Sequence, residues 1–317
     1  MKTLLVGEPM QLFMADEPGE LKDIRHYSVS VAGAELNVAI GLQRLGHEVA
    51  YYTHVGHDPF GDHIRDHMQQ SGIDTSLIRE DETRKTGFML KSKTHRGDPA
   101  IFYFRSGSAA SAIGPDDVES LDLTGCTALH MTGIFPALSP ATAQAARLLM
   151  QKARAQGLFI SFDPNLRPSL WPSEAVMRDT LNELAFMADL VLPGIGEGEI
   201  LTGSREPSKI AAFYRENGVK TVIIKTGKYG AYGENGRETI QVPTYQEDRF
   251  VDTVGAGDGF AAGVLSAIYE GLSFRDCLLR GNAIGTIQIM NPSDNEGLPS
   301  RKELAQFMAT HDLKEIQ

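Results

Sequence analysis

The segment Asp252-Thr-Val-Gly-Ala-Gly-Asp258-Gly-Phe-Ala-Ala-Gly263 joins a glycine-rich turn to an apolar, helix-like run. Gly255 and Gly257 flank Ala256, and such small residues let backbone N–H groups converge on one point. A helix that begins there adds the positive end of its dipole, which predicts an anion site. A bound anion repels a carboxylate, but Asp258 fits a base that deprotonates an acceptor hydroxyl while the amides hold the phosphoryl group. The alternative is a plain strand-to-helix turn with Asp258 as its N-cap.

The whole twelve-residue string resembles the C-terminal signature of the ribokinase-like (PfkB) carbohydrate kinases. It is neither a Walker A loop nor a Rossmann G-x-G-x-x-G. A second segment, Ala32-Gly-Ala-Glu-Leu-Asn-Val-Ala39 with V-G-H-D-P-F-G at 55–61, resembles the N-terminal signature of the same family. The resemblance implies a ribokinase-like α/β fold, with ATP and Mg²⁺ as cofactors and a monovalent cation such as K⁺ as a candidate third.

Composition narrows the function classes further. The 317 residues carry a net charge of −11, which argues against general nucleic-acid binding. An anionic substrate would need local Lys or Arg, because the overall field repels it. Cys126 and Cys277 make no disulfide framework or metal cluster, and the apolar run at the N-terminus is too short for a signal peptide or a membrane span. We therefore expect a cytoplasmic protein without nucleic-acid or membrane partners.

The hydrophobic pattern predicts alternating strands and helices through most of the chain. Strands Ala128–Met131 and Phe159–Phe162 precede helices Ser139–Ala155 and Ser173–Met187, and similar pairs follow. This alternation predicts right-handed βαβ crossovers and a mostly parallel central sheet with helices on both faces.

Two intervals without helical period, residues 10–32 and 86–106, interrupt that rhythm. Thr86–Lys93 and Ala100–Arg105 alternate in polarity around a turn at His95-Arg-Gly-Asp98, which predicts a hairpin. We expect the two intervals to form one small β-sheet lid over the carboxyl ends of the main strands, where such folds bind ligands. The core then comprises 1–9, 33–85 and 107–317. The alternative is that both intervals extend the main sheet as antiparallel edges.

The resemblance implies roles for residues on the nucleotide side. The turn Lys225-Thr226-Gly227-Lys228-Tyr229-Gly230 matches a K-x-G-x-x-G turn that lies beside the nucleotide phosphates and ribose, although a tight strand turn explains it as well. Asn282 matches a position that borders the adenine. The expected nucleotide-binding residues are therefore Lys225, Thr226, Gly227, Gly230 and Asn282.

The metal site shows a departure from the family pattern. Glu197 matches the acid of an Asn-x-x-Glu motif that is tied to hydrated Mg²⁺, but the Asn position holds Gly194, which has no side chain. The resemblance implies that Glu197 and Asp252 act on the metal through water. The glycine leaves open how the metal shell is completed.

Arginine and tyrosine residues point to the acceptor substrate. Alternation puts Tyr103 and Arg105 on one face of their strand, and Arg167 lies just past the carboxyl end of another strand. Guanidinium groups bind carboxylates bidentately, so this set predicts a carboxylate-bearing sugar. The alternative is that the two arginines pair with nearby acids or with nucleotide phosphates.

Further strings narrow the resemblance to 2-keto-3-deoxygluconate kinases: G-E-P at 7–9, F-Y-F-R-S-G-S-A-A-S at 102–111, G-I-F-P-A-L-S-P at 133–140 and D-P-N-L-R-P-S-L-W at 163–171. This resemblance implies that Tyr103, Arg105 and Arg167 contact the keto acid. It also implies that Gly33 and Asn37 contact the hydroxyl end and that Asp258 is the base for the terminal hydroxyl.

Three questions stay open at this point. D-x-N-L-R also occurs in fructokinase-like relatives, so a kinase of fructose or another neutral sugar is an alternative. A kinase-like protein kept for sugar binding without catalysis is a minor one, and Gly194 is its only hint. An exposed edge of the lid sheet would favour a homo-oligomer, with a dimer through the lid as one arrangement.

Overall fold

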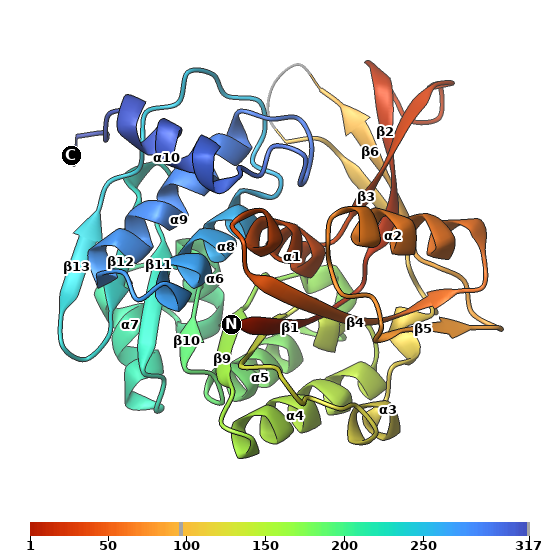
Figure 1. The fold of residues 1–317 in the computed structure, drawn as a ribbon, viewed down its shortest axis with the longest axis horizontal. Coiled ribbons are helices and arrows are strands. Elements are labelled where there is room, and N and C mark those ends of the chain that lie inside the picture. Colours follow the sequence, from red (N-terminus) through yellow and green to blue (C-terminus); the bar gives the residue numbers. More distant parts are fainter. Residues whose placement is uncertain (95–97, 316–317) are drawn as a thin grey trace.

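The computed structural model describes residues 1–94 and 98–315. Within this part of the chain, nine strands form one large sheet in the order β13-β12-β11-β10-β9-β8-β1-β4-β5 (Figure 1). The strands from β11 to β5 in that order are parallel, and β12 and β13 add an antiparallel edge. Their bounds are β1 Lys2–Val6, β4 Glu48–Gly56, β5 Ile78–Asp81, β8 Ala128–Thr132, β9 Phe159–Asp163, β10 Leu190–Val191, β11 Thr221–Lys225, β12 Ala231–Glu234 and β13 Thr239–Val242.

Helices cover both faces of this sheet, as the hydrophobic pattern predicts. In β1, Leu5 packs into one apolar core while Leu4 and Val6 pack into the other, because successive side chains point to opposite faces. The first core is closed by α1 Ala34–Arg44, α2 Pro59–Gln70, α8 Ala256–Tyr269, α9 Phe274–Ile289 and α10 Arg301–Thr310. The second is closed by α3 Pro115–Glu119, α4 Pro140–Ala155, α5 Glu174–Ala185, α6 Ile195–Thr202 and α7 Pro207–Glu216. None of the helices in the described residues is long and apolar enough to cross a membrane.

A separate four-stranded sheet is built from the two intervals that lack helical period. Its order is β3-β2-β6-β7, with β2 and β6 parallel and the outer pairs antiparallel. The bounds are β2 Met10–Pro18, β3 Tyr27–Ala32, β6 Phe88–Lys93 and β7 Ile101–Phe104. The small sheet stands beside α2, away from α4 and α5 (Figure 1). The alternative of extra edges on the main sheet is therefore wrong, while positions 95–97 of the expected hairpin turn lie outside the described residues.

Local signals account for most element boundaries. Ser139 and Ser173 cap α4 and α5 by accepting hydrogen bonds from the backbone N–H groups of Thr142 and Val176. α5 ends at Ala185 rather than at Met187. Two elements were not predicted, the edge strand β5 and the short helix α3, because their few apolar positions give little periodicity.

The ends of the central strands gather the polar residues of the site. Glu8 follows β1, Gly133 follows β8 and Asp163 ends β9, all at the carboxyl edge of the sheet. The chain leaves β1 toward β4 on one side and returns through β8 on the other. A crevice forms at such a reversal of strand order, and ligands of open α/β sheets bind there.

Candidate active site

The anion-binding turn has the geometry that its glycines predict. Gly255 is the N-cap of α8 and has a φ of 74°, a left-handed conformation that favours glycine. A Cβ at this position would lie 2.5 Å from the backbone oxygen of Asp294, so the turn also needs the space. The N–H of Ala256 bonds Thr253, whereas the first turn of a helix gives the amides of Gly257 and Asp258 no intrahelical acceptor. The end of α8 therefore presents N–H groups to an anion.

Asp258 lies at the start of α8 with only 9% of its surface exposed. The side-chain amide of Asn37 donates to its Oδ2 at 2.8 Å, and that of Asn165 donates to its Oδ1 at 3.4 Å. Burial raises the pKa of Asp258 to about 7, although the Asn37 hydrogen bond and the charge of Arg167 act in the opposite direction. A carboxyl group with this pKa exchanges protons near neutral pH, as a general base must.

One cavity of about 290 Å³, the acceptor cavity, brings the expected substrate residues together with Asp258. A Cβ on Gly33 would stand 3.1 Å from the backbone oxygen of Glu8, a tight contact that glycine avoids. The cavity lies between the small sheet and the carboxyl edge of the large one. The predicted residues that line it are Gly33, Asn37, Tyr103, Arg105, Arg167, Lys225, Gly255, Gly257 and Asp258.

Arg105 enters the acceptor cavity already paired with an acid. Its Nε donates to Oε2 of Glu8 at 2.6 Å, and its Nη2 lies 2.5 Å from the same oxygen without hydrogen-bond alignment. Ser108 donates to the other oxygen of Glu8. The guanidinium stands 5.6 Å from the ring of Tyr103, which is 42% exposed. The alternative that an arginine pairs with a nearby acid thus holds for Arg105.

Arg167 is bound differently. Its Nη1 donates to Oδ1 of Asn165 at 2.7 Å and to the backbone oxygen of Leu166 at 2.9 Å, both neutral acceptors. Among the described residues, no carboxylate lies within ion-pair distance of this guanidinium. Asn165 has a φ of 39°, an unusual conformation that aims its side chain at both Arg167 and Asp258. Arg167 therefore keeps its positive charge available for a ligand.

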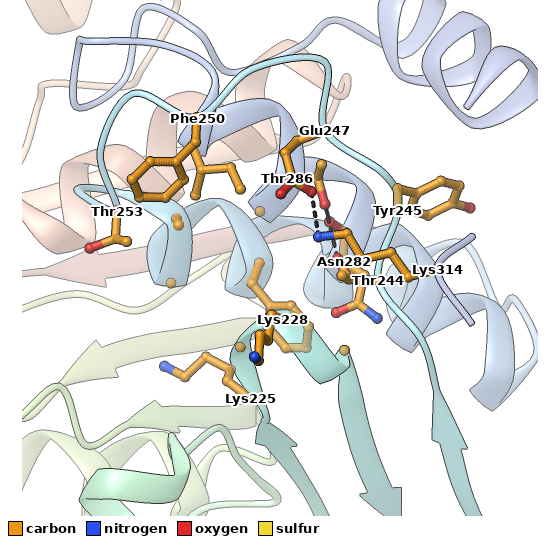
Figure 2. Close-up of a pocket in the computed structure, with 17 residues that line it drawn as sticks. Lys225, Lys228, Thr244, Tyr245, Glu247, Phe250, Thr253, Asn282, Thr286 and Lys314 are labelled. Atoms are coloured by element: carbon orange, nitrogen blue, oxygen red, sulfur yellow. Dashed lines mark hydrogen bonds and ion pairs between the residues drawn. The ribbon is translucent and has the colours of Figure 1, made fainter. Parts of the chain in front are cut away.

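A second cavity of about 480 Å³, the nucleotide-side cavity, lies on the other side of α8. Figure 2 shows Lys225 and Lys228 on one wall and Phe250 on the opposite wall. The side-chain nitrogen of Asn282 donates to the backbone oxygen of Pro243 at 3.0 Å. The side-chain oxygen of Asn282 can therefore accept a hydrogen bond from a ligand. The expected residues that line it are Lys225, Gly227, Gly230, Ala256, Gly257 and Asn282.

Thr226 is the exception in this set. It does not line the nucleotide-side cavity, and its hydroxyl oxygen is buried without a hydrogen-bond partner in the described structure. The turn between β11 and β12 places the glycines, not Thr226, toward the ligand. Thr226 instead closes the turn, since its N–H donates to the backbone oxygen of Gly230.

Lys225 lines both cavities. Its Nζ lies 2.7 Å from Oδ2 of Asp163 and 3.9 Å from Oε2 of Glu197. Burial lowers the pKa of Lys225, but attraction to these two carboxylates outweighs burial, so the pKa lies above its ordinary value. The ammonium thus stays charged beside the anion-binding turn, where a transferred phosphoryl group would need it.

The two acids expected at the metal bond different partners in the structure. Glu197 accepts N–H groups from Gly194 at 2.6 Å and Leu166 at 2.9 Å, so the backbone of Gly194 contributes here although its side chain is absent. Asp252 lines neither cavity, because its carboxylate faces Lys91 at 3.5 Å. Residues 1–94 and 98–315 contain no group of three metal-ligating side chains. A Mg²⁺ ion would therefore fit only with phosphate oxygens and water as most of its ligands.

The site residues that were not predicted include Glu8, Asp163, Asn165 and Lys91. Glu8, Asp163 and Asn165 end or follow the carboxyl ends of strands β1 and β9, and that position was the available signal. Lys91 gives no such signal, because it lies within a strand of the small sheet, beside a second lysine at position 93.

A ribokinase-like fold with a buried carboxylate in one of two cavities that meet at Gly257 defines the chain as an enzyme of the carbohydrate kinase class. The family model for pfkB family carbohydrate kinases matches residues 2–301. The chain therefore belongs to the pfkB family of carbohydrate kinases, as the two signatures predict.

Named relatives and solved structures agree with this assignment. A 2-dehydro-3-deoxygluconokinase of Bacillus subtilis (strain 168) is 46% identical over 305 residues, which cover 96% of this chain and 94% of the relative. The crystal structure of a PfkB protein from Polaromonas sp. is 43% identical with a TM-score of 0.89, covering 96% of this chain and 99% of the other. An E. coli protein described as ribokinase II, solved with ATP and Mg²⁺, is 26% identical with a TM-score of 0.88, covering 98% and 99%.

Proposed function

We propose that this kinase transfers the γ-phosphoryl group of ATP to the terminal hydroxyl of a sugar acid, with 2-keto-3-deoxygluconate as substrate and its 6-phosphate as product. The observation that carries the proposal is Arg167, whose guanidinium lines the acceptor cavity with Asp258 and has no carboxylate partner in the described residues. A neutral sugar gives such a charge nothing to neutralise, whereas a substrate carboxylate pairs with it bidentately. The family and the 46% identity to a 2-dehydro-3-deoxygluconokinase support the same substrate.

In this proposal the acceptor lies with its acid end at Arg167 and its hydroxyl end at Asp258. Tyr103 and Arg105 add contacts to the keto acid, and Gly33 and Asn37 contact the hydroxyl end. Asp258 takes the proton of the terminal hydroxyl as the oxygen attacks phosphorus. Asn37 holds the Oδ2 of that carboxylate and so orients the base.

The transferred phosphoryl group would lie at the N-terminal end of α8. The amides of Gly257 and Asp258, with the ammonium of Lys225, would stabilise the charge on its oxygens, while Gly255 and Ala256 shape the turn, since the N–H of Ala256 bonds the backbone oxygen of Thr253. ATP would fill the nucleotide-side cavity along Gly227, Gly230 and Asn282. Mg²⁺ would arrive with the phosphates and neutralise part of their charge, with Glu197 acting through water. Asp252, tied to Lys91, would reach such a metal only by releasing that lysine.

We assign residues 10–32 and 86–106 to a lid that closes the acceptor cavity, and 1–9, 33–85 and 107–317 to the core. Closure would exclude water and so limit wasteful ATP hydrolysis. Val29, Phe102 and Phe104 of the small sheet are exposed, which supports a homodimer through the lid. Sedimentation of Phe104→Glu tests the dimer, since a monomer is the expected result.

Cofactor use and location complete the proposal. K⁺ is a candidate activator, tested by replacing it with tetramethylammonium at constant ionic strength. Cys126 and Cys277 are free in the structure, which together with a need for ATP supports a cytoplasmic location.

The decisive experiment is ADP release with Mg-ATP, comparing 2-keto-3-deoxygluconate, fructose and related keto acids. We expect a kcat/KM advantage of at least about a hundredfold for the keto acid, equal to about 2.7 kcal/mol of transition-state discrimination. A preference for fructose would keep the kinase and reject the carboxylate role of Arg167. Sugar-acid binding without any ADP release would reject catalysis and support a binding protein.

A further inference from the structure

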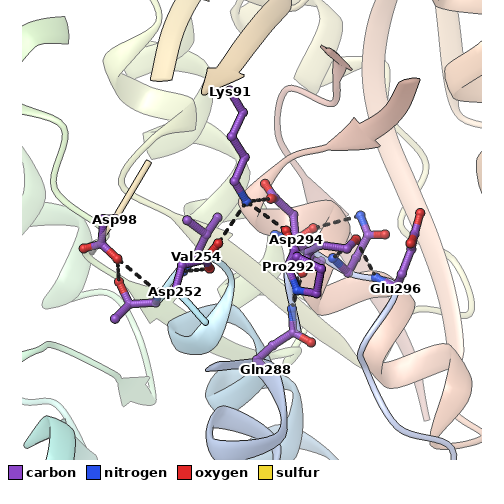
Figure 3. A network of polar contacts seen from close by, with 12 residues as sticks. Lys91, Asp98, Asp252, Val254, Gln288, Pro292, Asp294 and Glu296 are labelled. Carbon is purple, nitrogen blue, oxygen red and sulfur yellow. Dashed lines mark hydrogen bonds and ion pairs between the residues drawn. The ribbon is translucent and has the colours of Figure 1, made fainter. Parts of the chain in front are cut away.

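Lys91, on strand β6 of the small sheet, is a buried cation that reaches into the large domain. Only 4% of its surface is exposed. Its Nζ lies 2.9 Å from Oδ1 of Asp294, 3.3 Å from the backbone oxygen of Pro292 and 3.5 Å from Oδ2 of Asp252 (Figure 3). Within residues 1–94 and 98–315 it is the basic side chain in ion-pair distance of either carboxylate. The ammonium of the small sheet therefore holds together two acids that would otherwise repel each other.

One of these acids shapes the anion-binding turn. The Oδ1 of Asp252 accepts the N–H of Val254 at 3.0 Å, immediately before Gly255 begins the turn. Asp98, which follows strand β6, accepts two hydrogen bonds from Thr253. The backbone N–H of Thr253 donates at 3.1 Å and the hydroxyl of Thr253 donates at 2.8 Å. Lys91 of β6 and Asp98, which precedes β7, thus contact Asp252 and Thr253, the residues before the turn (Figure 3).

The other acid belongs to a segment that supports the catalytic base. The backbone oxygen of Asp294 faces Gly255 so closely that a Cβ there would be 2.5 Å away. The next residue, Asn295, donates its side-chain N–H to Oδ1 of Asn37 at 3.2 Å. That bond fixes the amide of Asn37 with its nitrogen toward Asp258. The segment around Asp294 therefore contacts both the turn and the residue that orients the base.

We propose that Lys91 is a positioning residue for phosphoryl transfer. Its ammonium draws the Asp252 turn and the Asp294 segment together, and because it is carried by the small sheet, the anion-binding amides reach their working geometry only when that sheet is seated. The inference rests on the proposed phosphoryl transfer at Asp258. Its structural part, that Lys91 orders residues 252–257, is measurable without any turnover.

The test is the Lys91→Ala variant, which leaves two acids and a carbonyl oxygen around an empty space of suitable size for a small amine. We expect kcat to fall about a hundredfold, as a misplacement of about 1 Å can do, while KM for the acceptor changes by less than about threefold. Methylammonium or ethylammonium at constant ionic strength should restore at least about a tenth of the lost rate by replacing the ammonium. The matched control is Lys93→Ala on the same strand, whose exposed Nζ bonds the backbone oxygen of Asp16, and it should keep its kcat.

Hydrogen–deuterium exchange of residues 252–257 supplies the second readout. Exchange should be faster in Lys91→Ala than in the wild type or Lys93→Ala, and slower again when alkylammonium is added. Unchanged exchange, or a loss of kcat that no amine restores, would overturn the inference. If Lys91→Ala does not fold, we would use the double variant Lys91→Met with Asp294→Asn, which removes the cation together with one of its acids. Unchanged exchange of residues 252–257 in this double variant would overturn the inference. If the wild type turns over no acceptor, the proposed function fails while the exchange result still decides the role of Lys91.

Discussion

The acceptor cavity and the nucleotide-side cavity share the end of α8 but differ in how they are built. The acceptor cavity, about 290 Å³, is lined by charged side chains from seven separate parts of the chain: Glu8, Glu35, Arg105, Arg167, Lys225, Asp258 and Asp294. The nucleotide-side cavity, about 480 Å³, is lined largely by glycines, apolar groups and neutral side chains, together with Lys225, Lys228, Lys314 and Glu247. The difference suggests that one cavity selects among acceptors while the other holds a common donor.

Charge pairing within the acceptor cavity sharpens this contrast. Arg105 is already neutralised by Glu8, whereas Arg167 is held by neutral oxygens. Glu35 is buried, which raises its pKa, and it accepts a hydrogen bond from Thr132 at 2.6 Å, so it needs no ligand charge. A bound carboxylate would therefore complete the pairing of one group, Arg167. The mutations below test that assignment from the largest expected effect to the smallest.

Asp258→Asn should have the largest effect on kcat, because it removes the proposed general base. We expect kcat to fall by about 10³-fold, within the range for loss of a general base, because an amide cannot take the hydroxyl proton. Asparagine still accepts the hydrogen bond from Asn37 through its oxygen, so the site should keep its shape. Calorimetric Kd values for the sugar acid and ATP should stay within about threefold of the wild type. Equal losses in binding and turnover would reject the base.

Arg167→Ala should separate acidic from neutral acceptors. We expect kcat/KM for 2-keto-3-deoxygluconate to fall about a hundredfold, the scale of a lost charge-assisted pair, because the substrate carboxylate loses its partner. The value for fructose should change by less than about threefold. Arg167→Lys is the control, since it keeps the charge and loses the bidentate geometry. Its kcat/KM for 2-keto-3-deoxygluconate should lie between the values of the wild type and Arg167→Ala. Equal losses on both sugars would show that Arg167 has a structural role.

How far these residues could be foreseen depends on whether their contacts are local. The anion-binding turn could be predicted because its residues are consecutive, Gly255 to Asp258. The turn, the start of the helix and the carboxylate all follow from that one segment. The small sheet is equally visible, because its strands lack a helical period. The pairing of Arg105 with Glu8 crosses 97 positions and that of Lys91 with Asp294 crosses 203, and no local pattern records such contacts. Asp252 is a further example, since its ion-pair partner Lys91 lies on a strand that is distant in the sequence.

The pH dependence should report the buried carboxylate directly. Burial raises the pKa of Asp258 to about 7, so the carboxylate form needed for catalysis is lost as pH falls through that value. We expect kcat/KM to fall roughly tenfold from pH 8 to pH 6, since this parameter follows the pKa of the free enzyme. Asn37→Ala removes a hydrogen bond that favours the charged form, so it should move the midpoint upward, which titration of ATP would not do. A midpoint near 4 would mean that Asp258 is not desolvated in solution.

Asn282→Ala should have the smallest effect, because the nucleotide-side cavity relies little on any single side chain. Its amide already bonds the backbone oxygen of Pro243, so one carbonyl oxygen remains for the nucleotide. Loss of one neutral hydrogen bond is worth about 0.5–1.5 kcal/mol, so KM for ATP should rise about two- to tenfold with KM for the sugar acid unchanged. Thr286→Val, on the same helix and cavity wall, removes a hydroxyl that bonds Thr244 and serves as the control for general loosening of the wall. A rise of more than about a hundredfold in KM for ATP with Asn282→Ala, beyond what one neutral hydrogen bond supplies, would mean that this cavity selects its ligand as strongly as the acceptor cavity does.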